Sequence, residues 1–257
     1  MPVVTLTTDW GIKDFYVGAL KGALLTELPT LNIVDISHFA HPFDLLNGAF
    51  IFRNAWKHFP TGTVHIIGLI SEAEKEAELI AVKYQNHFFI GLNDGFFSLA
   101  FDETPSEIVS LFTVQETKTS LYEKEVSKAA VFLANGGDFY LLGSKVENFV
   151  QRTHLQPVIE ENAIRGTVIY LDEFQNVITN INKEIFERMG TREKFVINAR
   201  RDEYIITSLS NKYSDVPRGH LLALFNSAGY LEIALNQGNA AGLLGMSYGD
   251  IVRIDFK

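Results

Sequence analysis

Two carboxylates and a glycine follow the first apolar run of the sequence within six residues. Val3–Thr8 is short, apolar and β-branched, a pattern typical of a buried strand, and Asp9, Gly11 and Asp14 come directly after it. In open parallel α/β sheets, ligands bind beyond the carboxyl ends of the strands, which is where Asp9 is expected. A carboxylate there suits the paired hydroxyls of a ribose, because it accepts two hydrogen bonds without a metal ion. The alternative is structural, with Asp14 capping the next helix and Asp9 in a turn.

Two further segments place polar side chains between apolar runs. Asn93-Asp94-Gly95 is either a polar loop that faces a ligand or a plain Asn-Asp-Gly turn. The five residues from Asp172 to Asn176 offer a carboxylate, the aromatic face of Phe174 and an amide, a set that suits a purine nucleoside. A hairpin loop has the same composition, so both interpretations stay open for this segment.

A third segment, Phe225–Gly229, has the same character, and Asn226 and Ser227 are its polar members. The seven histidines are scattered and include no i, i+4 pair, so a zinc site is not expected. The sequence contains no dinucleotide-binding, P-loop or nucleophile-elbow motif. Four glutamates crowd one short stretch, where they form either a solvated face or a catalytic set; they are Glu72, Glu74, Glu76 and Glu78.

The apolar periodicity of the first 100 residues predicts the elements that position these groups. Short apolar runs alternate with stretches of helical spacing, and this order implies right-handed crossovers and a mainly parallel sheet. A hairpin is expected around Gln85-Asn86, and a helix at residues 129–134 is expected to stop at Gly136-Gly137. The expected strands are Val3–Thr8, Asn32–Ile36, Thr63–Ile70, Leu79–Tyr84 and His87–Gly91, and the expected helices run from Val17 to Leu28 and from Asp44 to Trp56.

A polar stretch at residues 150–163, which includes Pro157, predicts a domain boundary. Short strand-like runs with turn signals between them follow it, a pattern typical of a small β-barrel or sandwich. We therefore expect an α/β N-terminal domain with a mainly parallel sheet, residues 1–150, and a smaller all-β C-terminal barrel domain, residues 164–257. The expected barrel strands are Thr167–Leu171, Val177–Ile181, Phe195–Ile197, Tyr204–Ser208, Leu221–Phe225, Leu231–Leu235 and Ile251–Ile254.

Composition narrows the class of protein. Apolar residues make up 47% of the 257, enough for a full core, and the absence of cysteine excludes disulfides, thiolate metal sites and a thiol nucleophile. A net charge of −9 argues against an electrostatic grip on nucleic acid or anionic lipid. The N-terminus lacks the basic region of a signal peptide, and no apolar run approaches the ~20 residues that span a bilayer. We expect a soluble cytoplasmic protein.

Six segments, in order and with similar spacing, resemble the S-adenosylmethionine (SAM) hydroxide adenosyltransferase family, which is related to the fluorinase and chlorinase enzymes. The Gly91–Gly95 segment resembles that family's G-P-D-N-G loop with the last two polar residues exchanged, and Phe225–Ala234 is the closest match. The six segments are Leu6–Gly11 with Asp14–Gly18, Ile33–His38 with Pro42–Asp44, Phe59–His65, Gly91–Gly95, Asp172–Asn176 with Thr179–Ile181, and Phe225–Ala234 with Asn236–Ala241.

The resemblance implies a parallel α/β domain, a C-terminal β-barrel and a homotrimer that binds its ligand between subunits. It implies that Asp9 holds the ribose hydroxyls, Phe43 lines the nucleoside pocket and Asp172 takes the methionine ammonium group. SAM is the expected substrate or ligand, with no metal and no further cofactor. The residues expected to bind it are Asp9, Asp14, Phe43, Asn93, Asp172, Phe174, Asn176, Asn226, Ser227 and Glu232.

This sequence departs from the family at the positions that activate water. The family's catalytic aspartate is replaced by Ile70, its arginine by Ala77 or Glu78, and its histidine by Leu121. The arginines that the halogenases carry in the barrel motif are also missing, with Ala228 and Leu235 in their places. The catalytic residues are therefore unknown, and the crowded glutamates offer one replacement base.

Three functions follow from the resemblance. The first is hydrolysis of SAM to adenosine and methionine by attack of water or hydroxide at the ribose C5′, which the retained binding motifs favour. The second is a catalytically inactive protein that binds or senses SAM or adenosine, which the lost catalytic set favours. SAM-dependent halogenation is a remote third, because the sequence shows no pocket for a dehydrated halide.

Overall fold

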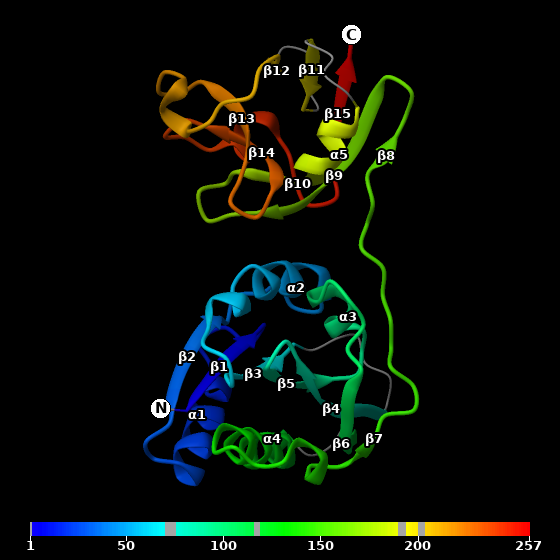
Figure 1. Cartoon of the computed structure of the whole chain (residues 1–257). Helices are drawn as coiled ribbons and strands as arrows, with labels where there is room; N and C mark the ends of the chain where they lie inside the picture. The colour runs from blue at the N-terminus through cyan, green and yellow to red at the C-terminus, as the bar shows by residue number, and fades with distance from the viewer. Residues whose placement is uncertain (1, 70–75, 116–118, 190–193, 200–203) are drawn as a thin grey trace. The chain divides into compact units, whose positions relative to one another are not determined.

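A mixed sheet forms the centre of the first part of the chain (Figure 1). The computed structural model describes residues 2–69, 76–115, 119–189, 194–199 and 204–257, and the chain divides into two units, Met1–Thr153 and His154–Lys257. Within the described residues, the strands of the first unit lie in the order β2-β1-β3-β5-β4-β6-β7. Their bounds are β1 Val3–Thr8, β2 Asn32–Ser37, β3 Val64–Gly68, β4 Glu76–Tyr84, β5 His87–Leu92, β6 Glu107–Gln115 and β7 Ser144–Lys145.

The sheet is parallel in one half and antiparallel in the other. Strands β2, β1, β3 and β5 pair in parallel, as the sequence predicts. Strand β4 pairs antiparallel with β5 and β6, and β6 with β7, so the prediction of a mainly parallel sheet is correct for one half only. The hairpin expected at Gln85-Asn86 causes the reversal. Both of its turn residues have positive φ, 46° and 61°, which is the requirement of a tight two-residue hairpin turn.

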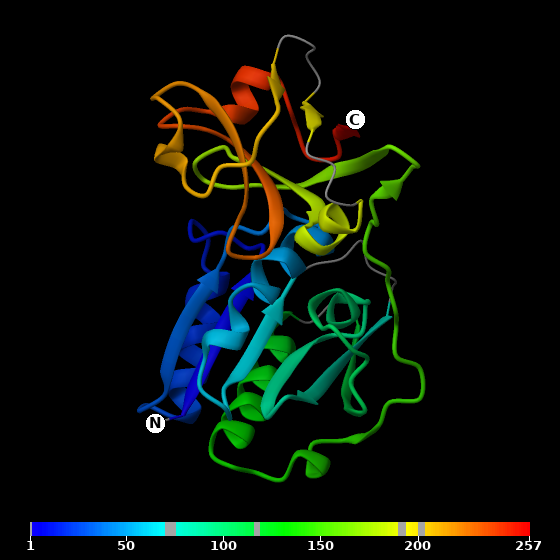
Figure 2. The same ribbon diagram turned by 45° about the horizontal axis from the view of Figure 1, so that its top comes forward.

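Helices cover both faces of this sheet (Figures 1 and 2). One face carries α1 with α4, and the other carries α2 with α3. Helix α1 buries Val17, Leu20 and Leu24, whose spacing places them on one side. Helix α2 begins after Asp44, whose carboxylate accepts a hydrogen bond from the Asn47 amide. The bounds are α1 Tyr16–Glu27, α2 Leu45–Arg53, α3 Phe96–Ala100 and α4 Thr119–Ala134, with short 3-10 helices η1 Trp56–His58 and η2 Phe139–Leu141.

Two apolar layers hold the sheet and its helices together. The layer under α1 and α4 is mainly aliphatic, whereas the layer under α2 and α3 is rich in aromatic rings. Burial of each large apolar side chain contributes about 1.5–3 kcal/mol, so these layers fix the strands and the loops at their carboxyl ends. The largest fully buried side chains of the aromatic layer are Phe52, Trp56, Phe89, Phe96 and Phe97.

The second unit is a nearly closed antiparallel barrel. Its strands lie in the order β12-β11-β15-β9-β10-β14-β13, with β8 paired to β9. A bridge between Leu209 and Ala223 brings the chain after β12 beside β13, which almost closes the sheet. Two short helices, α5 Lys183–Arg188 and α6 Ala240–Leu244, accompany the expected strands. The strands are β8 Val158–Ile159, β9 Ala163–Leu171, β10 Val177–Asn182, β11 Phe195–Asn198, β12 Ile205–Ile206, β13 Leu221–Phe225, β14 Tyr230–Leu235 and β15 Ile251–Phe256.

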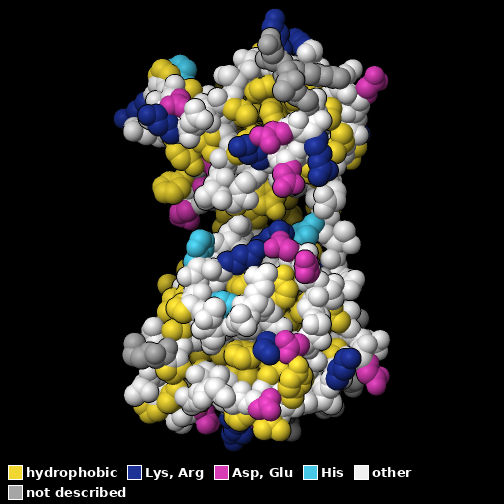
Figure 3. All heavy atoms as spheres, in the orientation of Figure 1, with side chains coloured by type: hydrophobic (Ala, Val, Ile, Leu, Met, Phe, Trp, Pro, Cys, Tyr) yellow, Lys and Arg dark blue, Asp and Glu magenta, His cyan; other side chains and the backbone are white. Residues whose placement is uncertain are grey.

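The charged side chains of the surface are of mixed sign. Figure 3 shows acidic and basic side chains interspersed over the face that it draws. Some of these side chains form ion pairs, such as Arg53 with Asp102 (2.6 Å) and Lys83 with Glu107 (2.9 Å). In the part of the chain that the structure describes, no helix is long and apolar enough to cross a membrane.

Candidate functional site

The loops that follow β1 and β2 are tied to each other at the carboxyl end of the sheet. Asp9 comes directly after β1, and its Oδ2 atom accepts a hydrogen bond of 3.4 Å from the backbone amide of Phe43. The amide of Gly11 donates to the carbonyl oxygen of His38 (2.7 Å). Phe43 has a φ of 64°, a backbone conformation that is uncommon for a bulky residue, and its side chain is 61% exposed. The carboxylate of Asp9 is therefore held in place at the predicted position.

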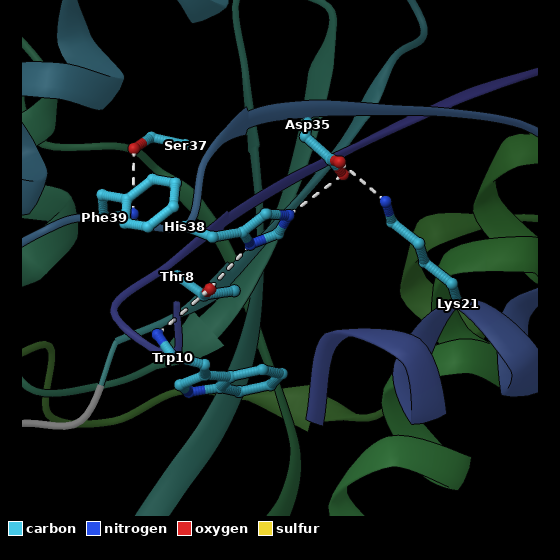
Figure 4. A network of polar contacts seen from close by, with 7 residues as sticks. All are labelled: Thr8, Trp10, Lys21, Asp35, Ser37, His38 and Phe39. Atoms are coloured by element: carbon cyan, nitrogen blue, oxygen red, sulfur yellow. Dashed lines mark hydrogen bonds and ion pairs between the residues drawn. The ribbon is translucent and has the colours of Figure 1, made fainter. Parts of the chain in front are cut away.

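A chain of polar contacts runs beneath this loop pair (Figure 4). Lys21 donates to Oδ2 of Asp35 (2.6 Å), and Nε2 of His38 lies 3.1 Å from Oδ1 of the same carboxylate. On the other side of the ring, Nδ1 of His38 lies 2.8 Å from Oγ1 of Thr8, which also accepts the Trp10 amide (3.4 Å). The contacts are mutually consistent when Thr8 donates its hydroxyl proton to Nδ1 and Nε2–H faces Asp35.

The charges and hydrogen bonds within these polar contacts favour the ionised form of Asp35. Partial burial raises the pKa of Asp35, but the hydrogen bonds from Lys21 and His38 and the charge of Lys21 lower it by more, so the net pKa lies below its usual value. A negative Asp35 holds the Nε2–H tautomer of His38 in place. Nδ1 then remains an acceptor for Thr8, the last residue before Asp9.

Exposed apolar side chains surround the same loops. The ring of Phe15 lies 4.4 Å from that of Tyr16, and the Trp10 ring lies against Gly68 at the end of β3, where an added Cβ atom would be 2.6 Å from Trp10 Cζ2. Apolar rings beside a fixed carboxylate suit a ligand with an aromatic base and hydroxyl groups. The exposed apolar side chains of these loops are Ile12, Phe15, Tyr16, Phe39 and Phe43.

Asp14 lies exposed in the loop after β1 and does not cap α1. The N-cap residue of that helix is Phe15, which makes no capping hydrogen bond through its side chain. The capping role that was the structural alternative for Asp14 is therefore wrong. Its proposed part in ligand binding stays a prediction.

Asn93 has a structural role in this arrangement. Its Nδ2 donates to Oε2 of Glu78 (2.9 Å) and to the carbonyl oxygen of Asn148 (2.8 Å), and its Oδ1 accepts the Val150 amide (2.9 Å). The neighbouring Asp94 accepts the amide of Phe96, the first residue of α3 (3.0 Å). Because both ends of the Asn93 amide are engaged, the structure favours the turn interpretation over a ligand contact for this residue.

In the second unit, Asp172 and Asn176 organise the loop between β9 and β10. The backbone amide of Asn176 donates to Oδ1 of Asp172 (2.8 Å), and Nδ2 of Asn176 donates to Oδ2 (2.9 Å). Gln175 has a φ of 63°, and Phe174 at the tip is 77% exposed. The segment is the hairpin loop that one interpretation predicts, yet it also presents an unpacked aromatic face beside a carboxylate.

The turn between β13 and β14 is built around Asn226 and Glu232. Oδ1 of Asn226 accepts the amides of Ala228 (3.0 Å) and Tyr230 (3.2 Å), which leaves Ser227 exposed at the tip. Nδ2 of Asn226 lies 3.3 Å from Oε2 of Glu232, a carboxylate that is only 3% exposed. Glu232 is therefore placed behind the turn, where it supports Asn226.

Glu232 interacts both with Asp172 and with the Asn226 turn. Burial raises the pKa of Glu232 above its usual value; hydrogen bonds from Tyr213 and Asn226 partly offset this rise, and the negative charge of Asp172 adds to it. The same charge contributes to the raised pKa of Tyr213. The loop from Asp172 to Asn176 leads into Val177, which pairs with Ile233, whereas the Asn226 turn leads into Tyr230, which pairs with Asn182. The two loops therefore lie at opposite ends of the β10–β14 pair, with Glu232 between them.

Two residues of these clusters have no role in the sequence interpretation. His38 belongs to a quoted motif, and its spacing of three from Asp35 at a strand end is the signal that could have found it. Tyr213 carries no comparable local signal, because its partner Glu232 is 19 residues away. The family positions for catalysis lie elsewhere: Ile70 is outside the described residues, and the side chains of Ala77 and Leu121 are also outside them. Among the described residues, no group of three or more potential ligands could hold a metal ion.

Family models match both units of the chain. Residues 4–143 match the SAM hydroxide adenosyltransferase N-terminal domain, and residues 166–253 match the SAM hydroxide adenosyltransferase C-terminal domain. Together the two matches cover most of the sequence.

Curated relatives and solved structures are similar over nearly the whole length. A protein of Methanocaldococcus jannaschii named (R)-S-adenosyl-L-methionine hydrolase is 27% identical, covering 99% of this chain and 96% of the relative. A protein of the same name from Thermus thermophilus is 26% identical, covering 99% and 100%. A fluorinase of Nocardia brasiliensis is 23% identical, covering 93% and 92%. The crystal structure of an uncharacterized conserved protein from Thermotoga maritima superposes with a TM-score of 0.86 at 25% identity, covering 98% and 99%.

Proposed function

Because the chain belongs to the SAM hydroxide adenosyltransferase family, we propose that it hydrolyses S-adenosylmethionine to adenosine and methionine. The observation that carries the proposal is the fixed position of Asp9 after β1, where it accepts the Phe43 amide among exposed apolar side chains. Relatives that are named (R)-SAM hydrolases support the reaction, and they also suggest the R epimer of the sulfonium as substrate.

In the proposed reaction, the oxygen of water attacks C5′ of the ribose as the bond between C5′ and sulfur breaks. Sulfur keeps the electron pair and leaves as the neutral thioether of methionine, and the attacking water loses one proton. The leaving group needs little acid assistance, because its positive charge disappears on departure. The task of the protein is therefore to align one water molecule with the C5′–S bond and to exclude others.

The two units would supply different contacts to the ligand. We propose that Asp9 accepts hydrogen bonds from the ribose hydroxyls and that Phe43 contacts the nucleoside. Asp172 would accept the ammonium group, since its two oxygens have lone pairs left after binding Asn176. The remaining proposed contacts to adenine or the amino-acid end are Phe174, Asn176, Asn226 and Ser227.

Binding without turnover is the second candidate function. The positions that the family uses to activate water hold Ile70, Ala77 or Glu78, and Leu121, so none of them carries the family's aspartate, arginine or histidine. Loss of a positioned acid–base group costs about 10²–10⁴-fold in rate. Of the crowded glutamates, Glu78 already accepts a hydrogen bond from Asn93, which favours a structural role for it.

The deciding experiment combines product analysis with calorimetry on one sample. Purified protein is incubated with each sulfonium epimer of SAM, and adenosine and methionine are separated by chromatography. Adenosine above a no-protein control supports hydrolysis. Tight binding without product supports the second function. Neither binding nor product would contradict both proposals.

A pair of aspartate variants tests the site itself. Asp9→Ala should weaken SAM binding at least about 10²-fold, because it removes two hydrogen bonds to a charged acceptor. Asp102→Ala is the matched control, because it removes a carboxylate that pairs with Arg53 and Lys57 on the surface. Equal affinity of Asp9→Ala and the parent protein would show that the ribose contact is placed wrongly.

The assembly is a further part of the proposal. The family resemblance implies a homotrimer whose ligand contacts two subunits. Light scattering should then give three times the chain mass of 28.8 kDa. A monomer that binds SAM with full affinity would contradict it.

A further inference from the structure

We propose that Tyr213 is a positioning residue of the candidate site, and that it acts through Glu232 on Asn226 and the turn that carries Ser227. This inference rests on the proposed function, because ligand binding is what the turn would serve. It assigns a role to a residue that lies outside the six sequence segments on which the family resemblance was first recognised. It also changes the role expected for Glu232 from a ligand contact to a support.

The contacts form a continuous path from one loop to the other. Tyr213 begins the 3-10 helix η3 (Tyr213–Asp215), and its hydroxyl donates to Oε1 of Glu232 on β14 (2.7 Å). The other oxygen of Glu232 lies 3.3 Å from Nδ2 of Asn226. Oδ1 of Asn226 in turn accepts the amides of Ala228 and Tyr230. One carboxylate thus joins the tyrosine loop to the turn between β13 and β14.

The burial of Glu232 makes this path necessary. A carboxylate that is 3% exposed is costly unless donors satisfy it, and both of its oxygens have one here. The 2.7 Å bond from Tyr213 is the shorter of the two. Without the tyrosine hydroxyl, one oxygen loses its donor, so Glu232 must turn, admit water or take up a proton. Each of these outcomes changes what Asn226 is bonded to.

The position of Tyr213 is itself set by its loop. Oδ2 of Asp215 accepts the amides of Asn211 (2.8 Å) and Lys212 (3.2 Å), which closes the turn that leads into η3. The tyrosine ring is partly exposed, so its hydroxyl, more than its packing, connects it to the barrel. Substitution by phenylalanine therefore removes the proposed contact and leaves most of the ring's packing intact.

The charges around Glu232 provide a readout that a purely structural role would not move. The titratable groups acting on Glu232 are Asp172 and Tyr213, while the paired strands place Ile178 and Leu224 opposite it. The hydrogen bond from Tyr213 lowers the pKa of Glu232, whereas burial and Asp172 raise it. Loss of the hydroxyl should therefore raise the pKa of Glu232 further, so that the carboxylate takes up a proton at higher pH.

The test compares two tyrosine-to-phenylalanine variants of the full chain. Tyr213→Phe removes the hydrogen bond to Oε1 of Glu232. Tyr140→Phe removes a similar bond to Glu107 (2.6 Å) on the surface of the first unit and is the matched control. We expect Tyr213→Phe to bind SAM about tenfold more weakly at neutral pH, with the acid limb of its affinity shifted to higher pH. Tyr140→Phe should match the parent in both. Glu232→Gln, which imitates the protonated carboxyl, should lose the acid limb.

Hydrogen exchange tests the positioning role without any ligand. The amides of Ala228 and Tyr230 are protected by Asn226, so exchange of the peptide that covers residues 226–230 should accelerate in Tyr213→Phe and not in Tyr140→Phe. A parent protein that neither binds nor cleaves SAM would overturn the proposed function, and the exchange result alone would then decide the role of Tyr213. Unchanged exchange in Tyr213→Phe, or unchanged affinity and pH profile in a parent that binds, would overturn this inference.

Discussion

The Nδ1 atom of His38 lies 2.8 Å from the Oγ1 atom of Thr8, and both side chains are almost completely buried (Figure 4). The contact joins the end of β2 to the end of β1, one residue before Asp9. A histidine ring offers two different nitrogens, and here each faces a different partner. Nδ1 contacts the buried hydroxyl of Thr8, and Nε2 faces the partly exposed carboxylate of Asp35. The two partners can therefore be separated by substitution.

Replacement of His38 by asparagine or glutamine should distinguish the two contacts. The oxygen of asparagine can take the place of Nδ1 and keep Thr8 bonded, whereas glutamine reaches toward Asp35 and leaves Thr8 without its acceptor. We expect His38→Gln to bind SAM about tenfold more weakly than His38→Asn and to lose a further 1–3 kcal/mol of unfolding free energy, roughly the cost of an unsatisfied buried group. Calorimetry measures the affinity for SAM, and urea unfolding measures the unfolding free energy. The reverse order of the two variants would mean that Asp35 is the partner that matters.

Asn93→Ala should lower stability and spare ligand binding. The substitution breaks two hydrogen bonds that hold residues 148–150 to the sheet and a third to Glu78, and we expect a loss of about 2–4 kcal/mol of unfolding free energy. The affinity for SAM should change less than threefold, in contrast to Asp9→Ala. A large loss of affinity in a folded Asn93→Ala protein would instead support the interpretation that Asn93 contacts the ligand.

The sequence predicts the elements whose pattern is local and strong. Strand β1 matches its expected bounds because six β-branched and apolar residues end at a polar break, and the β4–β5 hairpin follows from the Gln85-Asn86 turn. Helix α3 has only five residues, too few for a periodicity to be recognised. Strand β6 is missed although it pairs with β4 over its whole length, and with it the antiparallel pairings beyond the hairpin are missed.

The residues of the candidate site also differ in how far a local sequence pattern reveals them. Asp9 and Asp172 stand directly after β1 and β9, a position that sequence order reveals, while their contacts with a ligand stay a prediction. The roles of Asn93 and Tyr213 depend on partners 55 to 57 and 19 residues away, which no local pattern contains. Glu232 shows the same limit, since an acidic residue in an apolar strand is equally compatible with a ligand contact and a buried support.

Gly68→Ala should disturb the loop that carries Asp9. A Cβ atom at Gly68 would lie 2.6 Å from the Trp10 ring and 3.1 Å from Thr8 Cγ2, so the indole must move. Overpacking of this kind costs about 1–3 kcal/mol, and we expect weaker SAM binding with altered tryptophan emission. Gly18→Ala on α1, where an added Cβ meets nothing within 4 Å, is the control. Unchanged emission and affinity in Gly68→Ala would contradict the close packing of Trp10 on Gly68 and its link to the Asp9 loop.

The buried histidine pair of the first unit should make that unit sensitive to acid. Nδ1 of His65 lies 2.7 Å from Oγ1 of Thr5, and its Nε2 lies 3.1 Å from Nδ1 of His87. Burial, together with the charge that His87 acquires on protonation, lowers the pKa of His65 from its usual 6.5 to about 3. Between about pH 3 and pH 6.5, the unfolded chain therefore binds a proton at His65 that the folded chain does not bind. Stability is complete above about pH 6.5 and falls as the pH drops toward 3, by roughly 2–3 kcal/mol at pH 4.5.

Tryptophan fluorescence isolates this effect, because both tryptophans of the chain, Trp10 and Trp56, belong to the first unit, and Trp56 contacts the His65 and His87 rings. Urea unfolding followed by this signal should show a falling midpoint from pH 7 to pH 4.5. His65→Asn should be less stable at pH 7 but should lose the larger part of the pH dependence, because the amide cannot titrate; burial also lowers the pKa of His87, so a smaller dependence remains. His58→Asn, which removes an exposed histidine of the same unit, should keep the parent's slope. An unchanged slope in His65→Asn would assign the acid sensitivity to other groups, although the carboxylates with lowered pKa, such as Asp35, act only below about pH 4.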